Sequence, residues 1–181
     1  TNGAVERLLG AVERRAVGED EQCSDIITKA ARNALEAAEC SPLDLDRMIV
    51  SATPGDYFEP CTASVVQHKL GAKCPSMDIS MSCVGWVAGL DYALRCLATG
   101  DKKVLVAAGT IVSKGTAFFN PMHRAIFGDG AGAVVLERSE PGRFLAGALW
   151  TDGQYHDMIT MPHAASVPTA RVPEDYHGSF F

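Results

Sequence analysis

Apolar runs of strand length alternate along this chain with stretches of helical periodicity, and that alternation limits the folds open to it. Between residues 24 and 39 the apolar positions recur at the spacing of an amphipathic helix. Strands are expected at 47–53, 75–80 and 102–109, and helices at 61–71 and 84–100. Strands that alternate with helices imply β-α-β crossovers and a largely parallel sheet. The sequence therefore predicts an α/β fold.

The last strands of the pattern are expected to run differently. The run 102–109 is apolar throughout, which is typical of a parallel strand covered on both faces. Residues 132–139 and 143–150 are instead predicted to form two antiparallel strands that turn at "EPG". We expect a parallel sheet with an antiparallel addition late in the chain.

Composition bears on the class of partner. The 181 residues are 47% hydrophobic and 21% charged, with a formal net charge of −6. Such a chain has no general reason to bind nucleic acid or an acidic membrane surface. No run approaches the roughly 18 to 20 apolar residues of a membrane span, and the N-terminal "TNGAVERLLG" is too polar for a secretory signal. We expect a soluble cytoplasmic protein without a nucleic-acid or membrane partner.

The six cysteines include no C-x-x-C pair and no compact cluster. Their spacing therefore supports neither a disulfide framework nor a metal site. Most are expected to fill space as small buried hydrophobic residues. This expectation covers Cys23, Cys40, Cys61, Cys74 and Cys96.

The remaining cysteine, Cys83, stands in "DISMSCVGWVAGL" (78–90), at the predicted border between a strand and a helix. A helix N-terminus presents unpaired N–H groups and the positive end of the helix dipole, and both stabilise a thiolate. Since the thiolate is the nucleophilic form, this position favours a reactive cysteine. A buried structural cysteine is the alternative from position alone. Gly85 and Gly89 leave one side of the helix bare, where we expect a neighbouring helix or a substrate chain to approach.

A second motif, "FGDGAGAVVLE" (127–137), has three glycines within five residues before a strand. It lacks the lysine of a phosphate-binding loop and leads into a strand rather than a helix, which argues against a nucleotide site. We expect a tight turn whose backbone runs close to the surroundings of the reactive thiol. Asp129 in this turn is expected to orient backbone amides rather than to act as an acid.

Together the two motifs resemble those of the thiolase-superfamily condensing enzymes, and most closely β-ketoacyl-ACP synthase III. The matching segments are "DISMSCVGWVAGLDYAL", "IFGDGAGAVVLE", "LWTDGQYHDMITMP" and "GAVERR". The resemblance implies a three-layer α/β/α half of the five-layer thiolase-like architecture, formed by residues 1–162. Residues 163–181 are then expected to be a linker or lid toward a C-terminal half that is absent here.

The resemblance also implies a reaction. Cys83 would take an acyl group from a thioester, and the acyl-enzyme would condense with a malonyl thioester with loss of carbon dioxide. The implied substrates are acyl and malonyl thioesters on acyl-carrier protein or coenzyme A, with no metal or redox cofactor. A histidine and an asparagine from the family's second half stabilise the enolate. No histidine of this chain lies in those motifs, so we expect the chain alone to be unable to condense.

Further site residues follow from the resemblance. Ile126 and Phe127 are expected to line the acyl channel, with Thr53 and Phe58 nearer a dimer boundary. Ordinary core packing is the alternative for all four. Arg124 corresponds to an arginine that contacts phosphate in the family.

The chain also departs from the family pattern. The tryptophan and arginine that grip the adenine of coenzyme A fall at Ala4 and Leu8, and the phenylalanine that gates the partner's acyl channel is replaced by Glu59. These departures leave the acyl chain and the donor open. Family members form homodimers by pairing edge strands, and 102–109 is the edge strand expected here.

Two rival functions share these motifs. An acyltransferase of the same fold would load Cys83 and pass the acyl group to an alcohol or an amine. A non-catalytic half would serve as a dimerisation scaffold, and Cys83 would then be no more reactive than Cys40 or Cys96. The pathway stays open among fatty-acid synthesis, polyketide synthesis and other routes, such as those to quinolone precursors or hydroxymethylglutaryl-type products.

Overall fold

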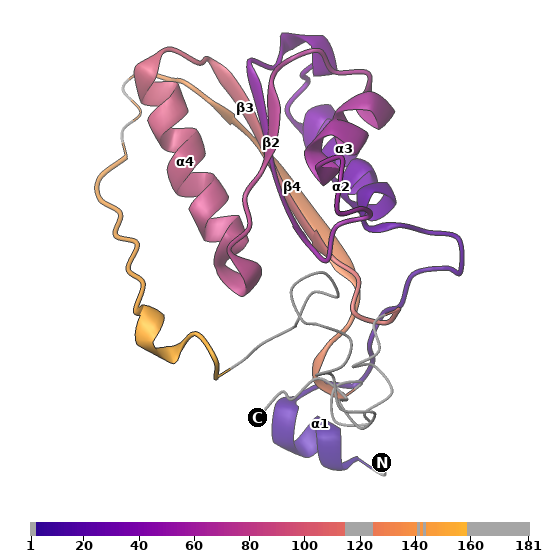
Figure 1. Cartoon of the computed structure of the whole chain (residues 1–181). Helices are drawn as coiled ribbons and strands as arrows, with labels where there is room; N and C mark the ends of the chain where they lie inside the picture. Colours follow the sequence, from indigo (N-terminus) through magenta and orange to yellow (C-terminus); the bar gives the residue numbers. More distant parts are fainter. Residues whose placement is uncertain (1–2, 115–124, 141, 143, 159–181) are drawn as a thin grey trace.

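A four-stranded sheet forms the centre of the protein, whose computed structural model describes residues 3–114, 125–140, 142 and 144–158. β1 runs parallel to both of its neighbours, whereas β4 is antiparallel to β3 (Figure 1). The expected α/β fold, with a parallel sheet and a late antiparallel strand, is confirmed. The linker or lid expected at 163–181 lies outside the described residues. Across the sheet the order is β2 (Ser76–Asp78), β1 (Arg47–Thr53), β3 (Lys103–Thr110) and β4 (Gly130–Glu137).

β3 lies inside the sheet, so the expectation that it provides an edge for dimerisation is wrong. Its backbone pairs along its length with β1 on one side and with β4 on the other. Its residues 104–107 are all buried, because helices cover both faces of the sheet at this strand. The two outer strands of the described sheet are β2 and β4.

The hairpin expected at 132–139 and 143–150 is also not formed. β4 begins two residues earlier than expected, and its partner is β3, from the Lys103–Glu137 pair to the Thr110–Gly130 pair. The described residues 144–150 have no regular secondary structure. Leu145 and Trp150 are each 84% exposed. The alternating pattern indicated two segments able to form strands, but it carried no information on which backbone edge each would meet.

Helices cover the two faces of the sheet and complete three layers. α2 (Cys23–Ala37) and α3 (Thr62–Leu70) lie on one face, and α4 (Gly85–Thr99) lies on the other (Figure 1). In the part of the chain that the structure describes, no helix has the length and apolar character to cross a membrane. Four short helices complete the described elements: α1 (Ala4–Leu9), which the sequence pattern did not predict, η1 (Pro42–Asp44), η2 (Ser82–Val84) and η4 (Gly153–Tyr155).

The sheet has a hydrophobic core on each side, as the alternation of side chains along β1 requires. Met48 and Val50 point to the α2–α3 side, where they meet Ile27 and Val66. Ile49 points to the opposite side, toward α4. All five side chains are at most 1% exposed. The site-bearing loops therefore rise from a sheet that is fixed from both faces.

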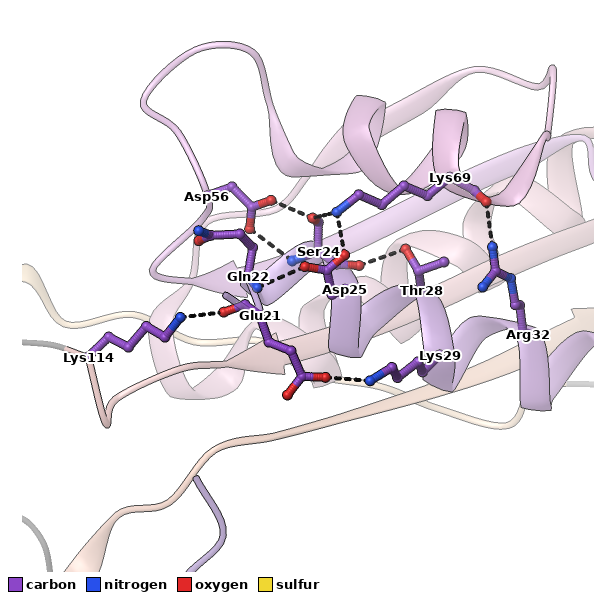
Figure 2. A network of polar contacts seen from close by, with 10 residues as sticks. All are labelled: Glu21, Gln22, Ser24, Asp25, Thr28, Lys29, Arg32, Asp56, Lys69 and Lys114. Atoms are coloured by element: carbon purple, nitrogen blue, oxygen red, sulfur yellow. Dashed lines mark hydrogen bonds and ion pairs between the residues drawn. The ribbon is translucent and has the colours of Figure 1, made fainter. Parts of the chain in front are cut away.

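A polar network joins the start of α2 to the loop after β1 and to α3 (Figure 2). Ser24 is fully buried, and its backbone N–H donates to Asp56 Oδ1 at 2.8 Å. Its hydroxyl donates to the other oxygen of Asp56 and accepts from Lys69 Nζ at 2.6 Å. Lys69 also pairs with Asp25 at 2.7 Å, and the hydrogen bond from Lys69 holds the pKa of Asp25 below its usual value. The network fixes where the loop after β1 leaves the sheet.

Candidate active site

Cys83 lies in η2, in the turn that connects β2 to α4. The parallel strands β1, β2 and β3 all end at this edge of the sheet, which is where α/β proteins place their binding and catalytic groups. The turn is closed by a 3.1 Å hydrogen bond from the Val84 N–H to the Met81 carbonyl. Ser82, next to the cysteine, has a φ of 45°, in the left-handed region that non-glycine residues rarely adopt. The expected passage from strand through turn to helix is confirmed.

The start of α4 is pressed directly against the sheet. A Cβ on Gly85 would lie 1.9 Å from Ser51 Oγ, and one on Gly89 would lie 3.0 Å from Val106 Cγ1. The bare side of the helix therefore faces β1 and β3, and not the neighbouring helix or substrate chain that we expected. Because both glycines are needed for this contact, they set the depth at which α4 and the preceding turn sit on the sheet.

The N-terminus of α4 follows directly on η2, and its first N–H, that of Gly85, donates to the Ser82 carbonyl. Its N-cap residue, Val84, makes no side-chain cap, and the first turn carries no acidic residue. The N–H groups and the positive end of the helix dipole therefore stabilise negative charge at this end of the helix, where Cys83 stands one residue before the cap.

All six cysteines lie in the described part of the chain, and Cys83 alone is exposed. Burial raises the pKa of Cys23 to about 12, and the nearby carboxylates of Asp56 and Asp129 add to the effect. Burial also raises the pKa of Cys40 and of Cys74. These three thiols are held in their neutral form, whereas Cys83 is accessible to a reagent.

Two more cysteines complete the comparison. Cys96, a residue of α4, is 8% exposed and lies in the core between that helix and the sheet. Cys61 is half-buried, and its sulfur lies 2.9 Å from Ser64 Oγ. The expectation of buried packing cysteines therefore holds for Cys23, Cys40, Cys74 and Cys96, and Cys61 is only partly covered.

The glycine-rich motif is organised by Asp129. Its carboxylate accepts the backbone N–H groups of Val17, Val112 and Ser113 at 2.8–2.9 Å, and also the Ser113 hydroxyl. Burial alone would raise the pKa of this carboxyl, but the hydrogen bonds, led by those from Ser113, bring it below its usual value. Asp129 thus orients backbone amides, as the sequence predicted.

The backbone that runs close to this motif is not the surroundings of the thiol. A Cβ on Gly128 would lie 3.2 Å from the Arg15 carbonyl oxygen, and that oxygen accepts the Asp129 N–H at 2.8 Å. Gly130 and Gly132 belong to β4 itself. The motif therefore joins the segment before α2 to the residues that follow β3. The close backbone contact that we expected near Cys83 is made with Arg15 instead.

Four other predicted site residues lie in the described part of the chain, at the same edge of the sheet as Cys83. Thr53 is the last residue of β1, and its carbonyl accepts the Thr110 hydroxyl. Phe58, in the loop between β1 and α3, is 79% exposed. Ile126 and Phe127 are half-buried just before β4. Their part in binding an acyl chain stays a prediction, and Arg124 lies outside the described residues.

A small cavity of about 130 Å³ opens at this edge on the α2 side of the sheet. Cys83 is not one of the described residues that line it, so the cavity and the exposed thiol are separate features. Its lining consists of Gln22, Cys23, Pro54, Gly55, Ile111 and Lys114.

Two features of the site were missed from the sequence. Asp78, the last residue of β2, caps the start of α3 with its carboxylate. The left-handed backbone of Ser82 gave no signal, since serine is common in turns of every kind. For Asp78, the available signal was an acidic residue at the end of the short predicted strand that contains "SMD".

Comparison with known proteins agrees with this geometry. The family model for 3-oxoacyl-[acyl-carrier-protein (ACP)] synthase III matches residues 77–153, which include both Cys83 and the glycine-rich motif. The β-ketoacyl-[acyl-carrier-protein] synthase III of Alkalilimnicola ehrlichii is 37% identical over 176 residues, covering 90% of this chain and 54% of the relative. The chain is therefore β-ketoacyl-ACP synthase III-like, and the resemblance recognised from its motifs is confirmed.

Solved structures of the family and its neighbours share the fold. The synthase III of Pseudomonas aeruginosa PAO1 superposes with a TM-score of 0.81 at 28% identity, covering 92% of this chain and 52% of that one. A variant of Xanthomonas campestris OleA superposes with a TM-score of 0.78 at 28% identity, covering 90% and 54%. The thiolase-like fold expected from the sequence is confirmed. The chain spans about half the length of the curated relatives it matches.

Proposed function

We propose that Cys83 accepts the acyl group in a condensing reaction of the synthase III type. The Cys83 thiolate attacks the carbonyl carbon of an acyl thioester, and the carrier thiol leaves. A malonyl thioester then loses carbon dioxide, and its α-carbon attacks the acyl-enzyme. The new carbon–carbon bond forms as the bond to Cys83 breaks, which returns the thiolate. Both steps are redox-neutral, so the reaction requires no redox cofactor, and we propose that no metal takes part.

The observation that carries this proposal is the exposure of Cys83 at the uncapped start of α4. The other five cysteines are wholly or partly covered. The turn also lies within the segment that the family model matches. A thiolate in this place exchanges readily with a thioester, whereas a thiol held neutral in the core cannot.

Similarity to the synthase III enzymes supports a proposal for the substrates and partners. We propose acyl and malonyl thioesters on acyl-carrier protein or coenzyme A, a homodimer, and a cytoplasmic location. We also propose that residues 1–162 correspond to the nucleophile-bearing, N-terminal half of the condensing unit, a proposal that the 54% coverage of a curated relative supports. The groups that stabilise the malonyl enolate would then be supplied from outside this chain.

A product assay tests the proposal. The chain is incubated with an acyl thioester and a malonyl thioester, alone and with the separately produced C-terminal half of the Alkalilimnicola ehrlichii relative, and a Cys83→Ala variant is treated in parallel. We expect carbon dioxide and a β-ketoacyl thioester in the complemented mixture only, and neither from the variant. A different outcome is that Cys83 is acylated and the acyl group passes to an alcohol or an amine, with no β-ketoacyl product. That result would show simple acyl transfer and would contradict condensation.

A further inference from the structure

The carboxylate of Asp78 makes two short hydrogen bonds to a helix that begins sixteen residues earlier in the chain. Its Oδ2 accepts the Thr62 N–H at 2.8 Å, and its Oδ1 accepts the Ala63 N–H at 2.7 Å. These are two of the N–H groups at the start of α3 that have no partner within the helix. The N-cap residue of α3, Cys61, makes no side-chain cap. Asp78, which belongs to β2, caps the helix instead.

Asp78 is also the end of the strand that leads to Cys83. β2 is an outer strand of only three residues, and Asp78 lies opposite Val50 of β1. One residue further on, the Ile79 N–H donates to the Val50 carbonyl at 2.8 Å. Beyond that bond the chain leaves the sheet and turns through Ser82 and Cys83 into α4.

The turn is therefore held at two ends. On the α4 end, Gly85 sits against Ser51 of β1. At the strand end, the turn is fixed by the hydrogen bond from the Ile79 N–H to β1 and by the two hydrogen bonds that the Asp78 carboxylate accepts from α3. Ser82 between them has a left-handed backbone, which persists only where the surroundings fix it.

We propose that Asp78 is a positioning residue for Cys83: by clamping the end of β2 to the start of α3, it holds the cysteine turn in place before α4. The inference rests on the proposed role of Cys83 as the nucleophile. Loss of the clamp lets the short outer strand and the turn after it move. Cys83 then no longer keeps its place before α4, and its reactivity toward an electrophile falls.

The chain offers a matched control in Asp46. Its carboxylate also accepts two consecutive backbone N–H groups, from Lys102 at 2.7 Å and Lys103 at 2.9 Å. These bonds lie just before β1 and at the start of β3, at the opposite edge of the sheet from Cys83. Removing either carboxylate leaves two N–H groups without an acceptor, so the two alanine variants should lose comparable stability.

The test compares Asp78→Ala, Asp78→Asn and Asp46→Ala with the unmodified chain. We measure the rate of alkylation by iodoacetamide at Cys83, resolved by peptide mass, and the free energy of unfolding in urea. We expect Asp78→Ala to slow alkylation at least about tenfold and Asp46→Ala to leave the rate within about twofold, at similar stability. Asp78→Asn keeps one acceptor oxygen and should recover part of the rate.

Amide hydrogen exchange provides the second measurement. Exchange at Val84, whose N–H closes the turn, should be faster in Asp78→Ala than in Asp46→Ala. Equal Cys83 alkylation rates in the two alanine variants, or an Asp78→Asn rate no higher than that of Asp78→Ala, would overturn the inference. Neither readout uses an acyl thioester, so failure of the positioning role is distinguishable from failure of the proposed acyl transfer.

Discussion

Gly85 and Ser51 lie so close that a single added carbon would not fit between them: a Cβ on Gly85 would stand 1.9 Å from Ser51 Oγ and 2.9 Å from Ser51 Cβ. Gly85 begins α4, two residues after Cys83, and Ser51 is a buried residue of β1. The contact ties the depth of the helix N-terminus to one strand side chain. It gives the reactive turn a fixed height above the sheet.

A Gly85→Ala substitution should therefore push the start of α4 away from the sheet. We expect the free energy of unfolding to fall by about 1–3 kcal/mol, which is the usual range for overpacking. The alkylation rate of Cys83 should fall as well. Urea unfolding and peptide-resolved alkylation measure the two effects.

The double variant Gly85→Ala with Ser51→Gly supplies the control, because it removes both Ser51 atoms that the new methyl group would meet. It should be more stable than the sum of the two single variants predicts. Strictly additive changes in free energy would show that the two residues do not oppose each other.

Cys23 should make the protein less stable in alkaline solution. The ordinary pKa of a thiol is 9.0, and that of Cys23 in the folded protein is about 12. Between these values the unfolded chain ionises and the folded chain does not, so stability is lost as pH rises, by up to about 1.4 kcal/mol per pH unit for this one group.

A Cys23→Ala variant tests this contribution. The cavity lowers its stability at every pH, but its free energy of unfolding should fall less steeply above pH 9. The raised pKa values of Cys40 and Cys74 are present in both proteins and cancel in the difference. Parallel pH curves for variant and parent would contradict a buried neutral thiol at Cys23.

Asp129 should contribute stability that disappears in acid. Its pKa in the folded protein lies below the usual 3.8, so its contribution is complete above that value and is lost as pH falls through the lower folded value. Asp129→Asn leaves backbone N–H groups poorly paired, and we expect a loss of about 1–3 kcal/mol at neutral pH. Urea unfolding at decreasing pH should show the gap between parent and variant closing below about pH 4. A gap that stays constant would rule out a charged acceptor.

The network around Ser24 predicts a stability effect away from the thiol. Ser24→Ala leaves half-buried Asp56 with one hydrogen bond fewer and removes one of the two side-chain acceptors of Lys69, the other being Asp25. We expect a loss of about 1–3 kcal/mol in the free energy of unfolding. Arg95→Ala, at the exposed Arg95–Asp91 pair of α4, is the comparison and should change nothing measurable. Equal effects of the two substitutions would contradict a structural role for the network.

Elements whose pattern is local were predicted well from the sequence. β1 spans 47–53 as expected, and α4 differs from its predicted limits by one residue at each end. Three signals set these limits: the apolar periodicity, Gly100 after the helix and the turn residues after Thr53. Each can be recognised from a few neighbouring residues. The position of Cys83 before α4 follows from the same local signals.

Features that depend on distant residues were not predicted. Nothing within 102–109 shows that β4 will pair with β3 and remove it from the edge. The clamp from Asp78 to Thr62 and Ala63 joins residues about sixteen apart, and Gly85 of α4 meets Ser51, which lies 34 residues earlier in β1. In a sequence, a glycine shows that a close backbone contact is possible, and an aspartate shows that a helix cap is possible. Only the folded structure shows which residue or helix each one contacts.

The most direct test of the account is the intact mass of the protein after incubation with acetyl-coenzyme A and with longer acyl thioesters on coenzyme A or acyl-carrier protein. We predict one acyl group added to the parent chain and to a Cys61→Ala control, and none added to Cys83→Ala. An adduct that persists in Cys83→Ala, or a parent chain that no acyl thioester of the series modifies, would contradict the role assigned to Cys83.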